Sequence, residues 1–106
     1  MAKKLAITYY RDIMRGIVAD IDIHSSGKEA LNYFMKNADK YFSTPTVWKN
    51  KRPESIPTGK SISVGMGFRF YICRFLSEEE SNLYKKYGDE CLFDPKYDTL
   101  ISPENS

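Results

Sequence analysis

Three residues that could bind a metal ion lie at alternate positions of one segment: Asp20, Asp22 and His24. Side chains at every second position of a β-strand share a face, and divalent cations accept carboxylate and imidazole ligands. A metal-dependent enzyme is therefore one hypothesis. A polar, solvent-facing side of a half-buried strand uses the same residue types. We favour this second interpretation and expect neither a metal site nor a cofactor.

A nucleophilic thiol is the next chemistry that the residue types allow. The two cysteines, Cys73 and Cys91, have only His24 as a histidine base, and a buried cysteine usually serves as a small apolar residue. We find no phosphate-binding glycine loop and no nucleophile elbow in the sequence. We therefore expect no catalytic residue and two reduced thiols, although a bridge between them stays open.

Basic and aromatic residues in two segments could bind RNA or DNA, because cations neutralise phosphates and rings stack on bases. The segment 67–72 has a faint likeness to a strand of the RNA-recognition motif, but Met66 and Arg69 depart from that pattern. Nucleic-acid binding is therefore the alternative function. Its candidate residues are Trp48, Lys49, Lys51, Arg52, Lys60, Arg69, Tyr71 and Arg74.

Protein binding is the function that we favour. Aromatic residues, methionine and arginine are enriched at the centres of protein interfaces, and the chain has eight tyrosines. Ile13 and Met14 are apolar residues in a predicted turn, where Gly, Asn, Asp and Ser are usual. Contact with a partner protein would explain them, and so would folding back onto the core. The candidate protein-binding residues are Ile13, Met14, Trp48, Arg52, Tyr84 and Tyr87.

The periodicity of the first half predicts the elements that position these residues. Segments 3–10 and 17–24 alternate and predict two strands of an antiparallel hairpin. Segment 28–42 carries an apolar stripe at helical spacing and predicts an amphipathic helix. The expected apolar face of the second strand consists of Ile17, Ala19, Ile21 and Ile23.

The second half begins with a long loop over 43–60, which contains three prolines. Segment 61–75 alternates throughout, so we expect one long strand with a bulge or bend near Met66 and with Phe68 and Phe70 in the core. Ser77 is expected to cap a second helix, in an S-x-x-E capping box with Glu80, that stops near Gly88. An extended segment at 96–101 and a frayed tail over 102–106 are expected to complete the chain.

This ββαβα order predicts one α+β domain over residues 1–106. We expect two layers: an antiparallel sheet with the long amphipathic helix packed on one face, and a second short helix. The length of 106 residues suits a single domain. Homodimerisation through an open edge of the sheet is left open at this point.

The charge is divided unevenly along the chain. Up to Leu76 there are thirteen lysines and arginines against six acidic residues, and from Ser77 on there are three against eight. The acidic third could pack near the basic body, or the two regions could steer the protein toward a charged partner. No apolar run approaches the ~20 residues of a membrane helix, and we expect a cytoplasmic protein without a membrane partner.

The lysine-, tyrosine- and asparagine-rich segments NYFMKNADKYF (32–42) and NLYKKYGDE (82–90) resemble the style of small accessory proteins from phages and mobile elements of low-GC Gram-positive bacteria. The anti-CRISPR inhibitors are among these proteins. The resemblance implies a stoichiometric inhibitor or adaptor in the host bacterial cytoplasm, which blocks a protein or ribonucleoprotein such as a CRISPR effector. It carries over no site residue.

Overall fold

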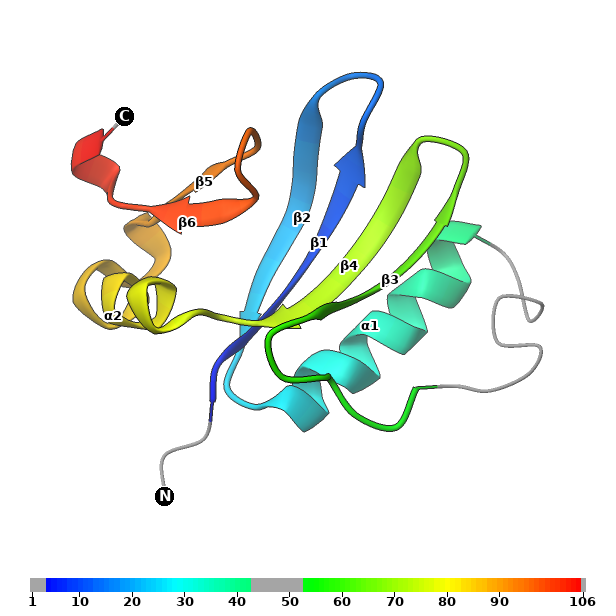
Figure 1. Cartoon of the computed structure of the whole chain (residues 1–106), viewed down its shortest axis with the longest axis horizontal. Helices are drawn as coiled ribbons and strands as arrows, with labels where there is room; N and C mark the ends of the chain where they lie inside the picture. The colour runs from blue at the N-terminus through cyan, green and yellow to red at the C-terminus, as the bar shows by residue number, and fades with distance from the viewer. Residues whose placement is uncertain (1–3, 43–52, 106) are drawn as a thin grey trace. The chain divides into compact units, whose positions relative to one another are not determined.

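The computed structural model describes residues 4–42 and 53–105. The chain divides into two compact units, Met1–Phe75 and Leu76–Ser106 (Figure 1). The boundary falls where the charge changes, so the first unit is basic and the second is acidic. The prediction of a single domain stays a prediction.

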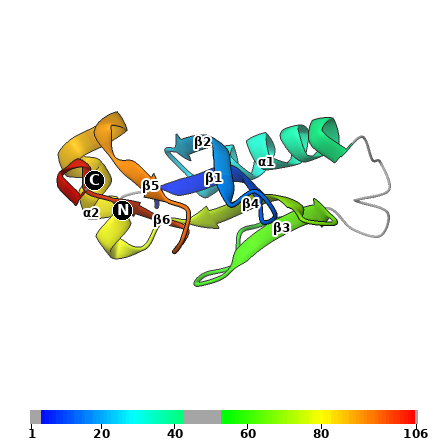
Figure 2. The same cartoon turned by 90° about the horizontal axis from the view of Figure 1, so that it is seen from above.

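The first unit is built on a four-stranded antiparallel sheet in the order β2-β1-β4-β3. Helix α1 packs against one face of this sheet, and Figure 2 shows the two layers. This arrangement, with a second short helix later in the chain, confirms the predicted fold class. The elements of the first unit are β1 (Ala6–Asp12), β2 (Ile17–His24), α1 (Gly27–Phe42), β3 (Ser61–Met66) and β4 (Arg69–Phe75).

The core of the first unit lies between α1 and the sheet. The helical spacing places one apolar stripe on the buried side of α1, as predicted. Phe34 from this stripe stacks on Tyr71 from β4, with ring centroids 5.6 Å apart. Full burial of a phenylalanine side chain contributes roughly 1.5–3 kcal/mol, so this pair anchors the helix to the sheet. The buried residues of the core are Ala6, Ala30, Leu31, Phe34, Ala38, Phe42, Ile56, Tyr71 and Cys73.

The predicted long strand over 61–75 is two strands joined by the two-residue turn Gly67-Phe68. Gly67 has a φ of 64° and Phe68 does not have a positive φ, which is the pattern of a type II′ turn. Apolar residues alternate without a break in the sequence across this turn. In space, however, the residues that face the core are even-numbered in β3 and odd-numbered in β4. The expectation that Phe68 and Phe70 lie in the core is therefore wrong: Phe68 is exposed in the turn, and Tyr71 and Cys73 occupy the core face of β4.

A bulge in β2 overturns the predicted apolar face of that strand. Thr8 pairs with Asp22, but Tyr10 pairs with Ala19, so Asp20 and Ile21 together oppose a single residue of β1. Asp20 has a φ of 52°, in the left-handed region that a β-bulge of this kind uses. The extra residue reverses the alternation, and Ile17 and Ala19 therefore face the opposite side from Ile21 and Ile23.

The second unit begins at the predicted second helix, α2 (Glu78–Tyr87). The Ser77 hydroxyl accepts the N–H of Glu80, and the Glu80 carboxylate accepts the N–H of Ser77 at 3.0 Å. The predicted capping box is thus confirmed. The other carboxylate oxygen of Glu80 accepts the N–H of Leu100 at 2.9 Å, so this buried side chain ties the helix to the strand that contains Leu100.

The end of the chain is more regular than predicted. The segment expected to be extended over 96–101 is part of a hairpin, in which a turn at 95–98 joins two short strands. The end of the chain that was expected to fray includes a 3₁₀ helix. These last elements are η2 (Gly88–Glu90), β5 (Leu92–Asp94), β6 (Thr99–Ile101) and η3 (Pro103–Asn105).

Candidate protein-binding surface

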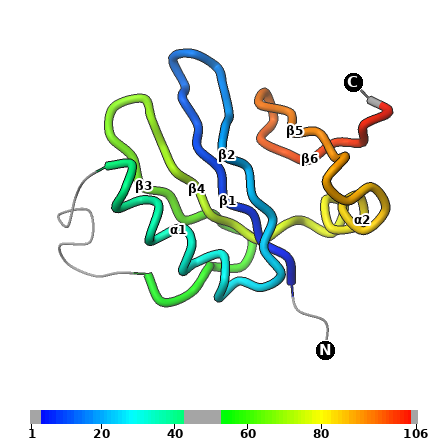
Figure 3. Tube along the Cα trace, turned by 180° about the vertical axis from the view of Figure 1, so that it is seen from behind, coloured from blue at the N-terminus to red at the C-terminus, as the bar shows by residue number. Residues whose placement is uncertain are grey.

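Two hairpin turns lie next to each other at one end of the four-stranded sheet, as Figure 3 shows. The β1–β2 loop spans residues 13–16, and its Gly16 N–H donates to the Ile13 carbonyl at 3.3 Å. The Ile13 N–H donates in turn to the carbonyl of Phe68 in the β3–β4 turn at 2.9 Å. Backbone hydrogen bonding therefore fixes the two turns side by side, although 55 positions separate Ile13 from Phe68 in the sequence.

Large apolar side chains are exposed on these turns. Met14 is 71% exposed, Phe68 56%, Met66 55% and Ile13 52%. Five of the ten exposed large apolar residues in the described part of the chain lie at this end. We call this set the hairpin-tip surface, and it consists of Ile13, Met14, Ile17, Met66 and Phe68.

Charged groups surround the hairpin-tip surface. Asp12 is buried and accepts the N–H of Arg15 at 3.1 Å, while the Arg15 guanidinium lies 3.8 Å from the same carboxylate. Arg69 pairs with Asp12 across the β1–β4 ladder and is exposed. The hydrogen bond from the Arg15 N–H to Asp12 holds the backbone of the loop. The two arginines leave positive charge beside the apolar side chains.

Sequence reasoning identified only part of this surface. Ile13 and Met14 are exposed, as a protein-binding role requires. Met66 and Phe68 were missed because their alternation resembled that of a core strand. The signal that could have found them is Gly67 followed by Phe68, since glycine at the first central position favours a type II′ hairpin turn.

The residues of the alternative metal-site hypothesis lie elsewhere, on the outer strand β2. The bulge takes Asp20 out of alternation with Asp22 and His24. Asp22 accepts the hydroxyl of Tyr33 at 3.0 Å, and this bond raises the pKa of Tyr33. The described residues contain no group of three histidine, cysteine or acidic side chains placed to hold a metal ion.

His24 belongs to a polar cluster between β2 and α1. Its Nε2 lies 2.9 Å from the Thr8 hydroxyl, and its ring packs on Tyr33 with centroids 4.9 Å apart. Burial lowers the pKa of His24, against the opposing effect of Asp22 and Glu29. A neutral imidazole held by Thr8 and Tyr33 is suited to a structural role.

Both cysteines are free thiols. Cys73 lies in the core, and burial raises its pKa to about 12. Cys91 is half-buried, its thiol donates to the Leu83 carbonyl at 3.4 Å, and burial also raises its pKa. Since the thiolate is the nucleophile, both side chains are in the unreactive form at neutral pH.

The residues of the nucleic-acid alternative do not form one patch where the structure describes them. Tyr71 is 1% exposed and packs in the core, so its ring is not available to a base. Arg69 and Arg74 lie at opposite ends of β4 and on opposite faces, while Lys60 precedes β3 at the end away from the turns. The remaining candidates, Trp48, Lys49, Lys51 and Arg52, lie outside the described residues.

The predicted protein-binding tyrosines of α2 belong to the second unit. Tyr84 is half-buried, and its hydroxyl donates to Asp89 at 3.4 Å. Tyr87 is also half-buried, with the Lys86 ammonium 5.1 Å from the centre of its ring. Each has a partner within its own unit.

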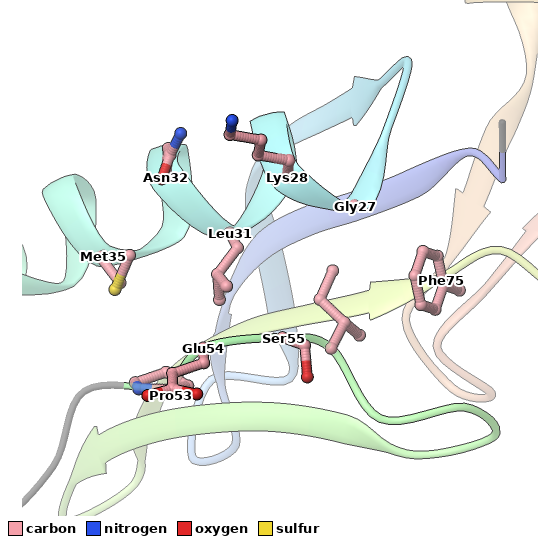
Figure 4. Close-up of a pocket in the computed structure, with 10 residues that line it drawn as sticks. Gly27, Lys28, Leu31, Asn32, Met35, Pro53, Glu54, Ser55 and Phe75 are labelled. Atoms are coloured by element: carbon pink, nitrogen blue, oxygen red, sulfur yellow. The ribbon is translucent and has the colours of Figure 1, made fainter.

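A groove of about 550 Å³ lies between α1 and the segment 53–56 (Figure 4). Leu31 and Met35 point into it from the helix, and Phe75 lines one end. Lys28 and Glu54 are among its polar lining residues, and none of the described residues that line it is histidine or cysteine. The groove is therefore suited to apolar packing, and sequence reasoning did not foresee it.

Comparison with protein-family models, curated proteins and solved structures finds no match for this chain. Among the described helices, none has the length and apolar character to cross a membrane.

Proposed function

We propose that this chain is a non-enzymatic binding protein, a stoichiometric inhibitor or adaptor, that docks the hairpin-tip surface onto a partner protein. The supporting observation is the exposure of Met14 and Phe68 on two turns that a backbone hydrogen bond holds together, and of Met66 at the end of β3 next to the second turn. Turns usually expose polar residues, and a group of exposed apolar side chains on a small protein commonly marks an interaction site.

The composition of the surface supports a protein as the partner. Methionine, phenylalanine and arginine are all enriched in interface centres, and the methionine side chain adapts its shape to a partner. The basic first unit, with Arg15 and Arg69 next to the apolar group, favours a partner surface with acidic residues around an apolar patch. The resemblance to anti-CRISPR inhibitors makes a CRISPR effector in a bacterial cytoplasm the first partner to test.

The first experiment locates the contact. A photo-crosslinking amino acid is placed at Phe68, and separately at Tyr97, which is 69% exposed in the second unit. We expect the Phe68 position to crosslink one bacterial protein specifically, in competition with unlabelled chain, and the Tyr97 position not to crosslink it. Calorimetry with the purified partner should then show saturation at a fixed molar ratio.

The second experiment measures what the surface contributes. The double substitution Met14→Asp with Phe68→Asp should weaken binding to that partner at least about 30-fold, since each site is a buried anchor in the proposed complex. Tyr97→Asp is the matched control and should leave affinity unchanged. Equal affinity of the double variant and the control, with both variants folded by circular dichroism, would contradict the proposal.

A further inference from the structure

In the part of the chain that the structure describes, the outer strand β3 has an edge without the usual protection against pairing. Within the described residues no further strand pairs with it. Ser61, Ser63 and Gly65 are exposed, and the strand from Ser61 to Met66 has no charge, no proline and no bulge. Proteins commonly protect an edge with one of these features, so β3 offers a template for another strand.

The register of the sheet identifies which backbone groups of β3 point outward. The Ile13 N–H bonds to the Phe68 carbonyl, and antiparallel ladders alternate bonded and non-bonded pairs. On β4, residues of even number thus direct their N–H and C=O groups toward β1, and Arg69, Tyr71 and Cys73 direct theirs toward β3. On β3, their partners Ile62, Val64 and Met66 direct their N–H and C=O groups toward β4. The outward groups therefore belong to Ser61, Ser63 and Gly65.

We propose that two copies of this chain pair through β3, as antiparallel strands centred on Ser63. A two-fold axis at Ser63 aligns Ser61 with Gly65 of the second copy and Ser63 with its own equivalent. All three outward donors and acceptors of each chain then find partners. On the α1 side, Ile62 lies opposite Val64 of the second copy, a β-branched pair that favours sheet pairing.

A second copy fits this edge because the strand complements itself. In a two-fold interface both copies use the same surface. A charged residue near the axis would therefore lie opposite a like charge, which is destabilising. β3 has no charge to repel its copy, whereas the other outer strand, β2, would bring Asp20 and Asp22 toward the same residues of a second chain. The bulge at Asp20 disturbs that edge further.

The pairing has a consequence that rests on the proposed function. Antiparallel pairing places the two hairpin-tip surfaces at opposite ends of one continuous sheet, because each β3 ends at its own turn. Met66 then lies beyond the paired core of the interface and stays available. One dimer would thus bind two partner molecules.

The backbone of Ser63 gives a direct test by sedimentation equilibrium of the full chain. Ser63→Pro removes the outward N–H at the centre of the interface without removing a bond to β4, and edge strands tolerate proline. We expect a dimer for the wild type and for the control Ser63→Ala, and weakening by about tenfold or more for Ser63→Pro. A wild type that remains monomeric at millimolar concentration would overturn the proposal.

A charge test keeps the proposal falsifiable if the proline variant fails to fold. Ser63→Lys and Ser63→Glu each place like charges opposite each other in a homodimer, so each alone should dimerise poorly and an equal mixture should form the heterodimer. Equal association of each variant alone and of the mixture would overturn the assigned register. Neither outcome depends on the partner protein: a dimer that does not bind through Met14 and Phe68 would refute the proposed function only.

Discussion

The two outer strands of the sheet, β2 and β3, present different edges. β2 carries Asp20, Asp22 and His24 and is interrupted by a bulge with a left-handed residue. β3 is uncharged and regular. Since charges and bulges prevent a strand edge from pairing with another chain, the sheet has one protected side and one side suited to pairing.

The turns that adjoin these strands differ in the same sense. The β1–β2 loop has four residues and depends on a side chain, Asp12, which accepts the N–H of Arg15. The β3–β4 turn has two residues and depends on the backbone of Gly67. A tight turn accompanies the unbroken register of β3 with β4, while the pairing of β2 with β1 has a longer loop and a bulge. Substitutions on each strand test this contrast.

The largest effect is expected at Gly65 on β3. An added Cβ there would lie 2.6 Å from the Arg69 carbonyl oxygen and would also collide with the Phe70 ring. Gly65→Ala should therefore lower the free energy of unfolding by about 1–3 kcal/mol, the usual cost of overpacking. Urea denaturation followed by circular dichroism measures the change.

The matched control for this prediction is Ser63→Ala, two residues earlier on the same strand and the same face. Ser63 is exposed, and substitutions at such positions usually change stability by less than about 0.5 kcal/mol. If Gly65→Ala is as stable as Ser63→Ala, the close approach of Phe70 to Gly65 does not fix the register of β3.

A smaller effect is expected at Asp20 in the bulge of β2. Its φ of 52° is tolerated by asparagine and aspartate but strongly disfavoured for a β-branched residue. Asp20→Val should lower the free energy of unfolding by about 1 kcal/mol, and Asp20→Asn should change it little. Equal stability of the two variants would mean that the bulge does not need a left-handed residue.

Local patterns predicted the helices well because their signals are contained in adjacent residues. The apolar stripe of α1 and the capping box of Ser77 with Glu80 need only short spacings to be visible. The two-residue turn at Gly67 was missed since alternation runs through it unbroken in sequence. The bulge at Asp20 was missed for a similar reason. One extra residue changes which face of the sheet the following side chains lie on, but the apolar residues of β2 alternate in sequence as they would in a regular strand.

The candidate site was harder to predict because it depends on long-range pairing. Ile13 and Met14 could be found as apolar residues in a turn. Their neighbours Met66 and Phe68 come from a distant hairpin, and only the β1–β4 ladder brings them together. Nothing in the spacing of either hairpin specifies that β1 pairs with β4, so Met66 and Phe68 were not recognised as part of the surface.

The smallest effect is expected from pH, and it should act through His24 on β2 and not through β3. Burial lowers the pKa of His24 below its ordinary value of 6.5, despite the nearby carboxylates of Asp22 and Glu29. On acidification the unfolded chain therefore takes up this proton more readily than the folded chain does, and stability is lost as the pH falls below that value.

From about pH 7.5 to about pH 5.5, above the ordinary range of carboxylates, the urea midpoint should decrease for the wild type. It should decrease less for His24→Gln, which cannot be protonated. β3 has no titratable side chain, so dimerisation measured over the same range should not change. A wild-type midpoint that rises in acid, or an equal decrease in His24→Gln, would show that His24 does not make β2 the pH-sensitive edge.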